Sequence, residues 1–530
     1  MIGNIIHLLH KHAENDPDRL ALIWGSGQSI SYSDLAQKIG SLARGFQKLG
    51  IEKGDRVLIF LPFGLDLYLS MFAVQHLGAI AVFLDSWARR DQLGLCAQIA
   101  RPKAMVSSEK AFQLSKEIPE MDQIPIKIAA GPSKEYSIRL EALSGGKKSC
   151  PIEPVNPDDT ALITFTTGSS GIPKGANRTH HFLAEQHRVL AEVIPYRGDE
   201  IDLPVFPIFA LNNLASGITT LLPAIDLAAP TAKDGEILAE QIEAYSISCC
   251  TLSPSLFMQI AASCRKSLPS LERVVTGGAP IGNDHVERFK TIAPKAEIII
   301  LYGSTEVEPI SHIEANEMLA YSQTRAQIRE GVNVGRISSG LNYKFLKITK
   351  EEIDLEKSGW PDWEAEKGKP GELIVSGSHV CEGYYNDEAA FKKAKIRDPN
   401  GTIWHRTGDV GTIDEEGYLW FVGRVHNAIC RAGQLLFPVH PEMLLKKLPF
   451  VRQAAYLGLP DLKLGEKACA IVALQAEIEK NRSFIDKIGD FLKEHRIPAD
   501  EIKIIDEIPM DPRHHSKVEY SKLAMQLQNE

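Results

Sequence analysis

A loop rich in glycine, serine and threonine is the part of this sequence whose residue types point most directly to chemistry. It spans 164–175, reads TFTTGSSGIPKG and directly follows an apolar, strand-like segment. Small residues let backbone N–H groups approach an anion, hydroxyls add donors, and Lys174 adds a mobile positive charge. The Gly-Lys-Ser/Thr spacing of a Walker A loop is absent. The pattern predicts a phosphate-binding loop of another kind, and a plain surface turn is the alternative.

Further blocks downstream carry a resemblance to a known family. YGSTE stands at 302–306, GEL and GYY within 371–385, RTGD at 406–409 and GR at 423–424, with Lys517 near the end of the printed sequence. In this order, and together with the loop, the blocks resemble the motifs of the adenylate-forming superfamily. That superfamily comprises acyl-CoA synthetases, nonribosomal peptide adenylation domains and luciferases.

The resemblance implies roles for individual residues. Tyr302 would stack on adenine, Asp409 would accept the ribose hydroxyls, and Arg424 would add positive charge beside them. Glu306 would hold a Mg²⁺ ion that bridges ATP phosphates, with Thr305 bonding phosphate next to it. The residues implied in nucleotide binding are Thr164, Thr166, Thr167, Gly168, Ser169, Ser170, Gly171, Lys174, Gly277, Gly278, Tyr302, Gly303, Asp409 and Arg424.

Lys517 is implied as a catalytic residue together with Thr305 and Glu306. The family carries a lysine in a Pro-Arg…Gly-Lys loop near its C-terminus, and here Ser516 replaces the glycine. A cation between an attacking carboxylate and the α-phosphate would stabilise the charge of an in-line displacement. Taken singly, a lysine near the end of a chain is more often a solvated surface residue.

Two departures from the family pattern bear on the second half-reaction. After Arg424 the family has a glycine-rich strand, where this chain has Arg431 and Ala432, which puts transfer to CoA in doubt. The stretches TTGSSGIPKGANRTH, FPIFALNN and DPRHHSK look closer to the β-lactone synthetases of bacterial olefin biosynthesis. In that branch a β-hydroxyl of the substrate closes on the acyl-AMP, and its proximity replaces an external thiol. His514 or His515 would then be a candidate base.

The helices and strands expected around these residues predict an α/β protein. Helix-like periodicity over 33–50 and 65–78 alternates with compact apolar runs near 56–62, 79–85 and 103–108. Further apolar runs at 160–167, 246–253, 271–278 and 296–303 each end in Gly, Ser or Thr. Such alternation predicts parallel sheets covered by helices, with ligands bound where strands end. The segment 370–424 instead reads as short strands joined by turns, a β-rich subdomain.

A change of pattern after Arg424 predicts a domain boundary. We expect an N-terminal AMP-binding domain over 1–424, formed by stacked, mostly parallel sheets with helices and the β-rich subdomain. Residues 425–530 would form a small, mobile α+β domain in which the elements follow as αββαβ. A small domain that carries one essential lysine would dock for adenylation and then rotate.

Composition narrows the class of protein. The 530 residues are 44% apolar, and 59 basic against 68 acidic residues give a net charge of −9. A mildly acidic chain has no electrostatic reason to bind nucleic acid. No apolar run suits a membrane span or a signal peptide, and the eight scattered cysteines fit a reducing compartment, so we expect a cytoplasmic protein. The oligomeric state stays open.

The function expected from these observations is ATP- and Mg²⁺-dependent activation of a medium- or long-chain fatty acid to acyl-AMP. Transfer of the acyl group to CoA would follow. One alternative is a β-lactone synthetase that cyclises a 2-alkyl-3-hydroxy acid without CoA, and another is an inactive nucleotide-binding protein. Chain length, hydroxylation of the substrate and the acceptor stay open.

Overall fold

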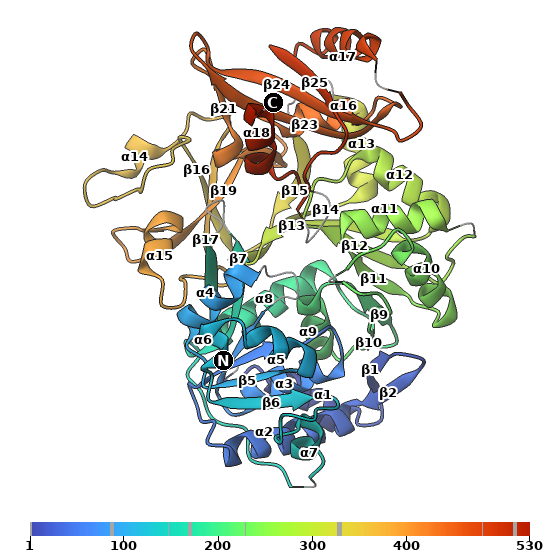
Figure 1. The fold of residues 1–530 in the computed structure, drawn as a ribbon, viewed down its shortest axis with the longest axis vertical. Helices are drawn as coiled ribbons and strands as arrows, with labels where there is room; N and C mark the ends of the chain where they lie inside the picture. Colours follow the sequence, from blue (N-terminus) through green and yellow to red (C-terminus); the bar gives the residue numbers. More distant parts are fainter. Residues whose placement is uncertain are drawn as a thin grey trace.

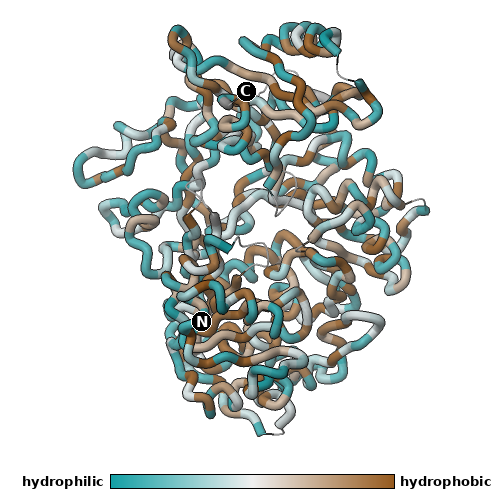
Figure 2. The backbone as a smooth tube through the Cα atoms, viewed as in Figure 1, coloured by the Kyte–Doolittle hydropathy of each residue, from teal (hydrophilic) through white to brown (hydrophobic). Residues whose placement is uncertain are grey.

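A computed structural model of the chain describes residues 3–84, 90–146, 148–167, 172–227, 229–264, 266–325, 331–479, 481–511 and 517–529. Three sheets organise these residues, with the N-terminal half at the bottom of Figure 1 and the C-terminal unit at the top. The α/β class expected from the sequence is confirmed. Apolar residues, brown in Figure 2, gather along the inner strands, whereas outer loops and helices are mainly hydrophilic.

The first sheet has the strand order β6-β5-β3-β4-β7-β8 and is parallel except for the antiparallel β8. Its strands are β3 (Arg56–Phe60), β4 (Ile80–Phe83), β5 (Ala104–Ser108), β6 (Ile126–Ala130), β7 (Thr160–Thr167) and β8 (Pro173–Thr179). The helices of this half are α1 (His7–Asn15), α2 (Tyr32–Lys48), α3 (Leu65–His76), α4 (Arg90–Ala100), α5 (Glu109–Ser115), α6 (Pro119–Asp122), α7 (Leu140–Ser144), α8 (His180–Val193) and α9 (Pro207–Ser216).

The second sheet has fourteen strands and contains the β-rich segment predicted over 370–424, which continues the sheet through the β15–β20 pair. Its strands are β1 (Leu20–Trp24), β2 (Gln28–Ser31), β9 (Ile201–Pro204), β10 (Thr219–Leu221), β11 (Cys249–Leu252), β12 (Arg273–Gly277), β13 (Glu297–Ser304), β14 (Val307–Glu314), β15 (Val332–Ile337), β16 (Leu341–Leu346), β17 (Gly371–Gly377), β18 (Lys395–Arg397), β19 (Ile403–Ile413) and β20 (Leu419–Arg424). The accompanying helices are α10 (Asp234–Ala244), α11 (Pro254–Ser263), α12 (Asn283–Ile292), α13 (Ala315–Arg325), α14 (Trp360–Trp363) and α15 (Glu388–Ala394).

The C-terminal unit follows a short 3₁₀ turn at Val425–Asn427, and its strands pair among themselves in a five-stranded sheet. It contains β21 (Ile429–Arg431), β22 (Gln434–Leu436), α16 (Val439–Leu445), β23 (Val451–Asp461), β24 (Gly465–Leu474), α17 (Arg482–Glu494), β25 (Glu501–Ile505) and α18 (Tyr520–Asn529). The predicted αββαβ order is therefore confirmed, and the structure adds the β21–β22 hairpin before it and α18 after it.

Local sequence signals explain where these elements begin and end. The Ser31 hydroxyl accepts the N–H of Asp34 and caps α2, and Gly50 stands at a φ of +83° just beyond the end of that helix. The residues that run through the middle of the strands are almost fully buried, for example Leu58, Ile163 and Val274. Within the described residues, no helix combines the length and the apolar character needed to cross a membrane.

Candidate active site

Glycines at the ends of β12 and β13 open space beside the polar strand ends. A Cβ atom on Gly277 would lie 2.3 Å from the carbonyl oxygen of Leu301, and Gly278 has a φ of +90°. A Cβ on Gly303 would lie 2.8 Å from the carbonyl oxygen of Val307. Only glycine fits such positions without moving the backbone, so the chain keeps the floor of this edge free of side chains.

Tyr302, Asp409 and Arg424 form one polar cluster at this edge. The Tyr302 hydroxyl donates to Asp409 Oδ2 at 2.7 Å, and Arg424 Nε lies 2.7 Å from Asp409 Oδ1. The antiparallel β19–β20 register places Asp409 opposite Arg424. Three residues far apart in the sequence are thus brought together, as the resemblance implied.

Glu306 follows β13 and is 9% exposed. Its Oε1 accepts the Tyr384 hydroxyl at 2.8 Å. Burial on its own raises the pKa of a carboxyl. For Glu306 the neighbouring His405 and Lys395 outweigh burial, and the pKa falls to about 2. Burial, followed by the field of Lys395, lowers the pKa of His405 to about 3. At neutral pH the carboxylate of Glu306 is therefore ionised.

The β7–β8 pair brings the base of the Ser/Thr loop from the other sheet to Tyr384, the side chain that bonds Glu306. Its register pairs Thr166 with Lys174, and Ala176 of β8 bridges Tyr384. Lys174 Nζ lies 5.6 Å from the centroid of the Tyr384 ring, the same ring whose hydroxyl bonds Glu306. The base of the loop and the acidic residue therefore meet at one side chain.

The remaining predicted site residues divide into three groups. Thr305 follows Ser304, and its carbonyl accepts Arg178 Nη2 at 2.7 Å. Gly168, Ser169, Ser170 and Gly171 lie outside the described residues, as do His514 and His515, while Thr167 is described only as the last residue of β7. Lys517 is exposed in the C-terminal unit, where its carbonyl accepts the N–H of Asp511.

The residues at this edge fit a nucleotide with a metal ion. The Thr164 hydroxyl is buried and, within the described part of the chain, has no hydrogen-bond partner, so it is available to a ligand. Among the described residues no group of three His, Cys, Asp or Glu side chains could bind a metal ion by itself. One ionised carboxylate suits Mg²⁺, which takes its other ligands from phosphate and water. When bound, such an ion would neutralise phosphate charge.

Three residues with contacts to this site carried no role in the sequence reasoning. Tyr384 was seen only as part of GYY, although its hydroxyl bonds Glu306. Arg178 is 3% exposed and holds the Thr305 carbonyl, and Lys395 is 2% exposed and donates to the Cys381 carbonyl. Arg178 follows the phosphate loop closely enough to be suspected from its position. Lys395 belongs to no motif, and only the folded chain reveals its burial.

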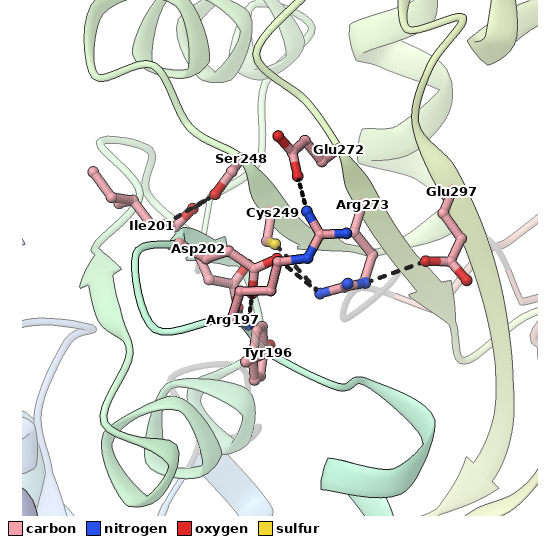
Figure 3. Close-up of polar contacts among 10 residues, drawn as sticks. Tyr196, Arg197, Ile201, Asp202, Ser248, Cys249, Glu272, Arg273 and Glu297 are labelled. Carbon is pink, nitrogen blue, oxygen red and sulfur yellow. Dashed lines mark hydrogen bonds and ion pairs between the residues drawn. The ribbon is translucent and has the colours of Figure 1, made fainter.

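A second buried polar cluster occupies the opposite ends of the same parallel strands (Figure 3). Arg273 begins β12, and its Nη1 lies 3.2 Å from Glu200 Oε1, with its Nε 3.5 Å from Glu297 Oε2. Asp202 accepts the Tyr196 hydroxyl at 3.0 Å and the Asn213 amide at 2.6 Å. Because Tyr302 lies near the far end of β13 and Glu306 follows that end, this cluster belongs to the base of the sheet.

A cavity of about 330 Å³ lies between α8, the start of β13 and the ends of β14 and β15. Four glutamates line it, together with His312 and Arg336: Glu192, Glu297, Glu314 and Glu317. This acidic lining disfavours a polyphosphate. The cavity is therefore a poor candidate for a nucleotide site.

Known proteins resemble this chain over nearly its whole length. An olefin beta-lactone synthetase of Xanthomonas campestris pv. campestris is 28% identical over 98% of this chain and 97% of its own. The putative acyl–CoA ligase YdaB of Bacillus subtilis is 25% identical over 94% of each chain. The structure of o-succinylbenzoate CoA synthetase MenE from Bacillus subtilis, in complex with an acyl-adenylate, superimposes with a TM-score of 0.79 at 20% identity, covering 98% of each chain.

The match to a whole family agrees with the geometry. The profile described as AMP-binding enzyme covers residues 9–385, which include the Ser/Thr loop, Tyr302, Glu306 and Tyr384. Its members use ATP, and the relatives are ligases and synthetases. The chain belongs to the AMP-binding enzyme family and is an adenylate-forming ligase of carboxylic acids.

Proposed function

We propose that the enzyme adenylates a 2-alkyl-3-hydroxy fatty acid and closes it to a β-lactone. A carboxylate oxygen attacks the α-phosphorus of ATP, a C–O–P linkage forms, and the bond to pyrophosphate breaks. The 3-hydroxyl then attacks the acyl carbonyl, AMP leaves, and the hydroxyl proton passes to a base. The full-length similarity to the Xanthomonas campestris olefin beta-lactone synthetase carries this choice.

The C-terminal unit supports an internal nucleophile. Arg431 of β21 donates to Asp500 through Nε at 2.7 Å and through Nη2 at 2.6 Å, and Asp500 Oδ2 also accepts the N–H of Ala468. The strand that is small and glycine-rich in thioester-forming relatives is here held against the sheet by a bidentate ion pair. A hydroxyl within the substrate needs no channel for an external thiol, and its proximity raises its effective concentration.

Transfer to CoA is the second candidate, favoured by the similarity to the Bacillus subtilis putative acyl–CoA ligase. In this case the acceptor thiol replaces the internal hydroxyl, and the acid can be a plain medium- or long-chain fatty acid. The adenylation step is common to both candidates, so the candidates differ only in the acceptor and in the acid that is accepted.

Product identification by mass spectrometry separates the two. The enzyme is incubated with ATP, Mg²⁺ and matched plain or 2-alkyl-3-hydroxy acids, with and without CoA. We expect a β-lactone from the hydroxy acid without CoA. An acyl-CoA that forms only with added thiol would favour the second candidate, and no acid-dependent pyrophosphate release from either acid would contradict both.

Within this function we assign nucleotide roles as the resemblance implied. Tyr302, Asp409 and Arg424 bind the nucleoside, and Glu306 holds Mg²⁺. The Ser/Thr loop, Lys174 and Thr305 bind phosphate. The cluster of Tyr302, Asp409 and Arg424 and the meeting of Lys174 and Glu306 at Tyr384 support this division.

Lys517 is assigned to the displacement step, delivered by a mobile domain over 425–530. The separate five-stranded sheet and the short turn at Val425–Asn427 support a hinge after Arg424. Replacing Lys517 with Ala should lower adenylation about 10²- to 10³-fold and leave ATP binding nearly unchanged. Pyrophosphate release and equilibrium nucleotide binding measure the two effects. Equal losses in both would contradict the assignment.

A further inference from the structure

Lys395 is a buried cation that the proposed chemistry does not yet use. It begins β18, pairs with His405 of β19 and is 2% exposed. Its ammonium group donates to the carbonyl of Cys381 and lies 5.5 Å from the centroid of the Tyr384 ring. A buried ammonium group is costly unless hydrogen bonds and a nearby anion compensate it. Burial lowers the pKa of Lys395, and an apolar side chain would fill the same space at lower cost, so a lysine at this position calls for an explanation.

Two connections lead from Lys395 to Glu306. The first runs through the main chain, because the Cys381 carbonyl accepts from Lys395 while the Cys381 N–H donates to the Glu306 carbonyl at 2.7 Å. The second runs through Tyr384, whose ring lies beside the ammonium group and whose hydroxyl donates to Glu306 Oε1 at 2.8 Å. Both the peptide and the carboxylate of Glu306 are thus held by groups that Lys395 contacts.

The same aromatic ring connects to the phosphate loop. Lys174 Nζ, from the other sheet, lies 5.6 Å from the ring centroid of Tyr384. Lys174 is partly exposed and can reach a ligand, whereas Lys395 is enclosed and cannot. Any influence of Lys395 on a bound phosphate must therefore pass through the residues that it contacts.

We propose that Lys395 is a positioning residue for Glu306, holding the peptide and the carboxylate where the metal ion of a bound polyphosphate will meet them. The inference rests on the proposed role of Glu306. Both hydrogen-bonded connections are in place with no metal bound, so the site is already arranged before the nucleotide arrives. Such preorganisation saves the cost of reordering the site during binding.

The test replaces Lys395 with Met and measures how Mg²⁺ and ATP stabilise the full chain. Thermal unfolding at fixed ATP and increasing Mg²⁺ gives the Mg²⁺ concentration for half-maximal stabilisation, without any carboxylic acid. We expect that concentration to rise about tenfold in Lys395→Met. The matched control is Lys393→Met, an exposed lysine on α15, which should behave as the wild type.

A double-variant cycle identifies the route of the effect. If Lys395 acts through Glu306, Lys395→Met should change the Mg²⁺ response less than twofold in a Glu306→Gln background. Full, independent effects of the two substitutions, or a wild-type response in Lys395→Met, would overturn the proposal. Lys395→Leu, which also removes the donor for the Cys381 carbonyl, is read in the same way if the Met variant does not fold. Failure of both variants to fold would make the residue purely structural and would also overturn the proposal.

The experiment stays informative if the proposed function is wrong. A wild type that responds to Mg²⁺ and ATP but forms no product from either acid would refute the substrate and leave the role of Lys395 tested. A wild type with no response to Mg²⁺ and ATP would refute the nucleotide site and the positioning role with it.

Discussion

Glu306 and Asp202 are buried carboxyl groups at opposite ends of the same parallel strands, and their pKa values move in opposite directions. Glu306, beyond the end of β13, is 9% exposed with a pKa of about 2. Asp202, near the start of β9, is fully buried, and burial raises its pKa to about 6. Burial alone therefore does not decide which carboxyl is ionised in this protein.

The difference lies in the partners. Asp202 Oδ2 accepts bonds from two neutral donors, Tyr196 and Asn213, while among the described residues Oδ1 has no partner. Glu306 receives one neutral bond, and the neighbouring His405 and Lys395 lower its pKa further. A carboxylate that holds a metal ion must be ionised, whereas one that joins strands at the base of a sheet need not be.

The largest expected effect is on activity, when the carboxylate of Glu306 is removed. Glu306→Gln keeps the shape but loses the carboxylate that would hold Mg²⁺, so acid-dependent pyrophosphate release should fall about 10²- to 10³-fold. The matched control is Glu287→Gln, at an exposed position on α12, which should retain full activity. Activity within threefold of the wild type would remove Glu306 from the proposed metal site.

Substitution of Asp202 should change the pH dependence of the free energy of unfolding rather than the activity. With a pKa raised from 3.8 to about 6, Asp202 contributes stability that is complete below about pH 3.8 and is lost as the pH rises through 6. Asp202→Asn removes this dependence, so the free energy of unfolding of the variant relative to the wild type should improve by about 2 kcal/mol between pH 4 and pH 8.

Urea unfolding at the two pH values measures this difference, and Asp199→Asn, at an exposed position, is the control. An identical stability difference at pH 4 and pH 8 would mean that the native Asp202 titrates as an ordinary carboxyl. The comparison with Glu306 would then fail.

A smaller loss of turnover is expected when the hydrogen bond from Tyr384 to Glu306 is removed. Tyr384→Phe removes the hydroxyl that donates to Glu306 Oε1 and leaves the ring beside Lys174 and Lys395. A hydrogen bond to a charged group contributes roughly 1.5 kcal/mol, so turnover should fall about tenfold. Tyr385→Phe, the adjacent substitution, should leave turnover unchanged in the same assay. Equal effects of the two substitutions would show that the hydroxyl of Tyr384 has no special part.

Sequence patterns were enough to predict the α/β class, the strands that carry the motifs and the order of elements in the C-terminal unit. They indicated Tyr302, Asp409 and Arg424 because each lies in a recognisable block, and the fold brings those three together. They could not indicate Lys395, because a lysine that begins a three-residue strand looks like any surface lysine. Its burial depends on the pairing of β18 with β19, which is a property of tertiary structure.

The continuation of the sheet through β15 and β20 was also beyond the sequence patterns. The segment over 370–424 reads as a subdomain because its strands are short and joined by turns. Local patterns define strands but not the neighbours with which they pair. The pairing of Val332 with Phe421 joins the segment to the rest of the sheet, and it involves residues about ninety positions apart.

The strands that carry the Ser/Thr loop and Glu306 belong to different sheets. The segment 380–384 connects these sheets, because Tyr384 bridges Ala176 of β8 and Val380 bridges Val307 of β14. The distance between the base of the loop and Glu306 therefore depends on how the hydrophobic cores of the two sheets pack against each other. A substitution in either core, far from any ligand, can lower turnover because it changes the orientation of one sheet relative to the other. Substitutions that adapt such an enzyme to cold or heat would then occur in its hydrophobic cores as well as among its active-site residues.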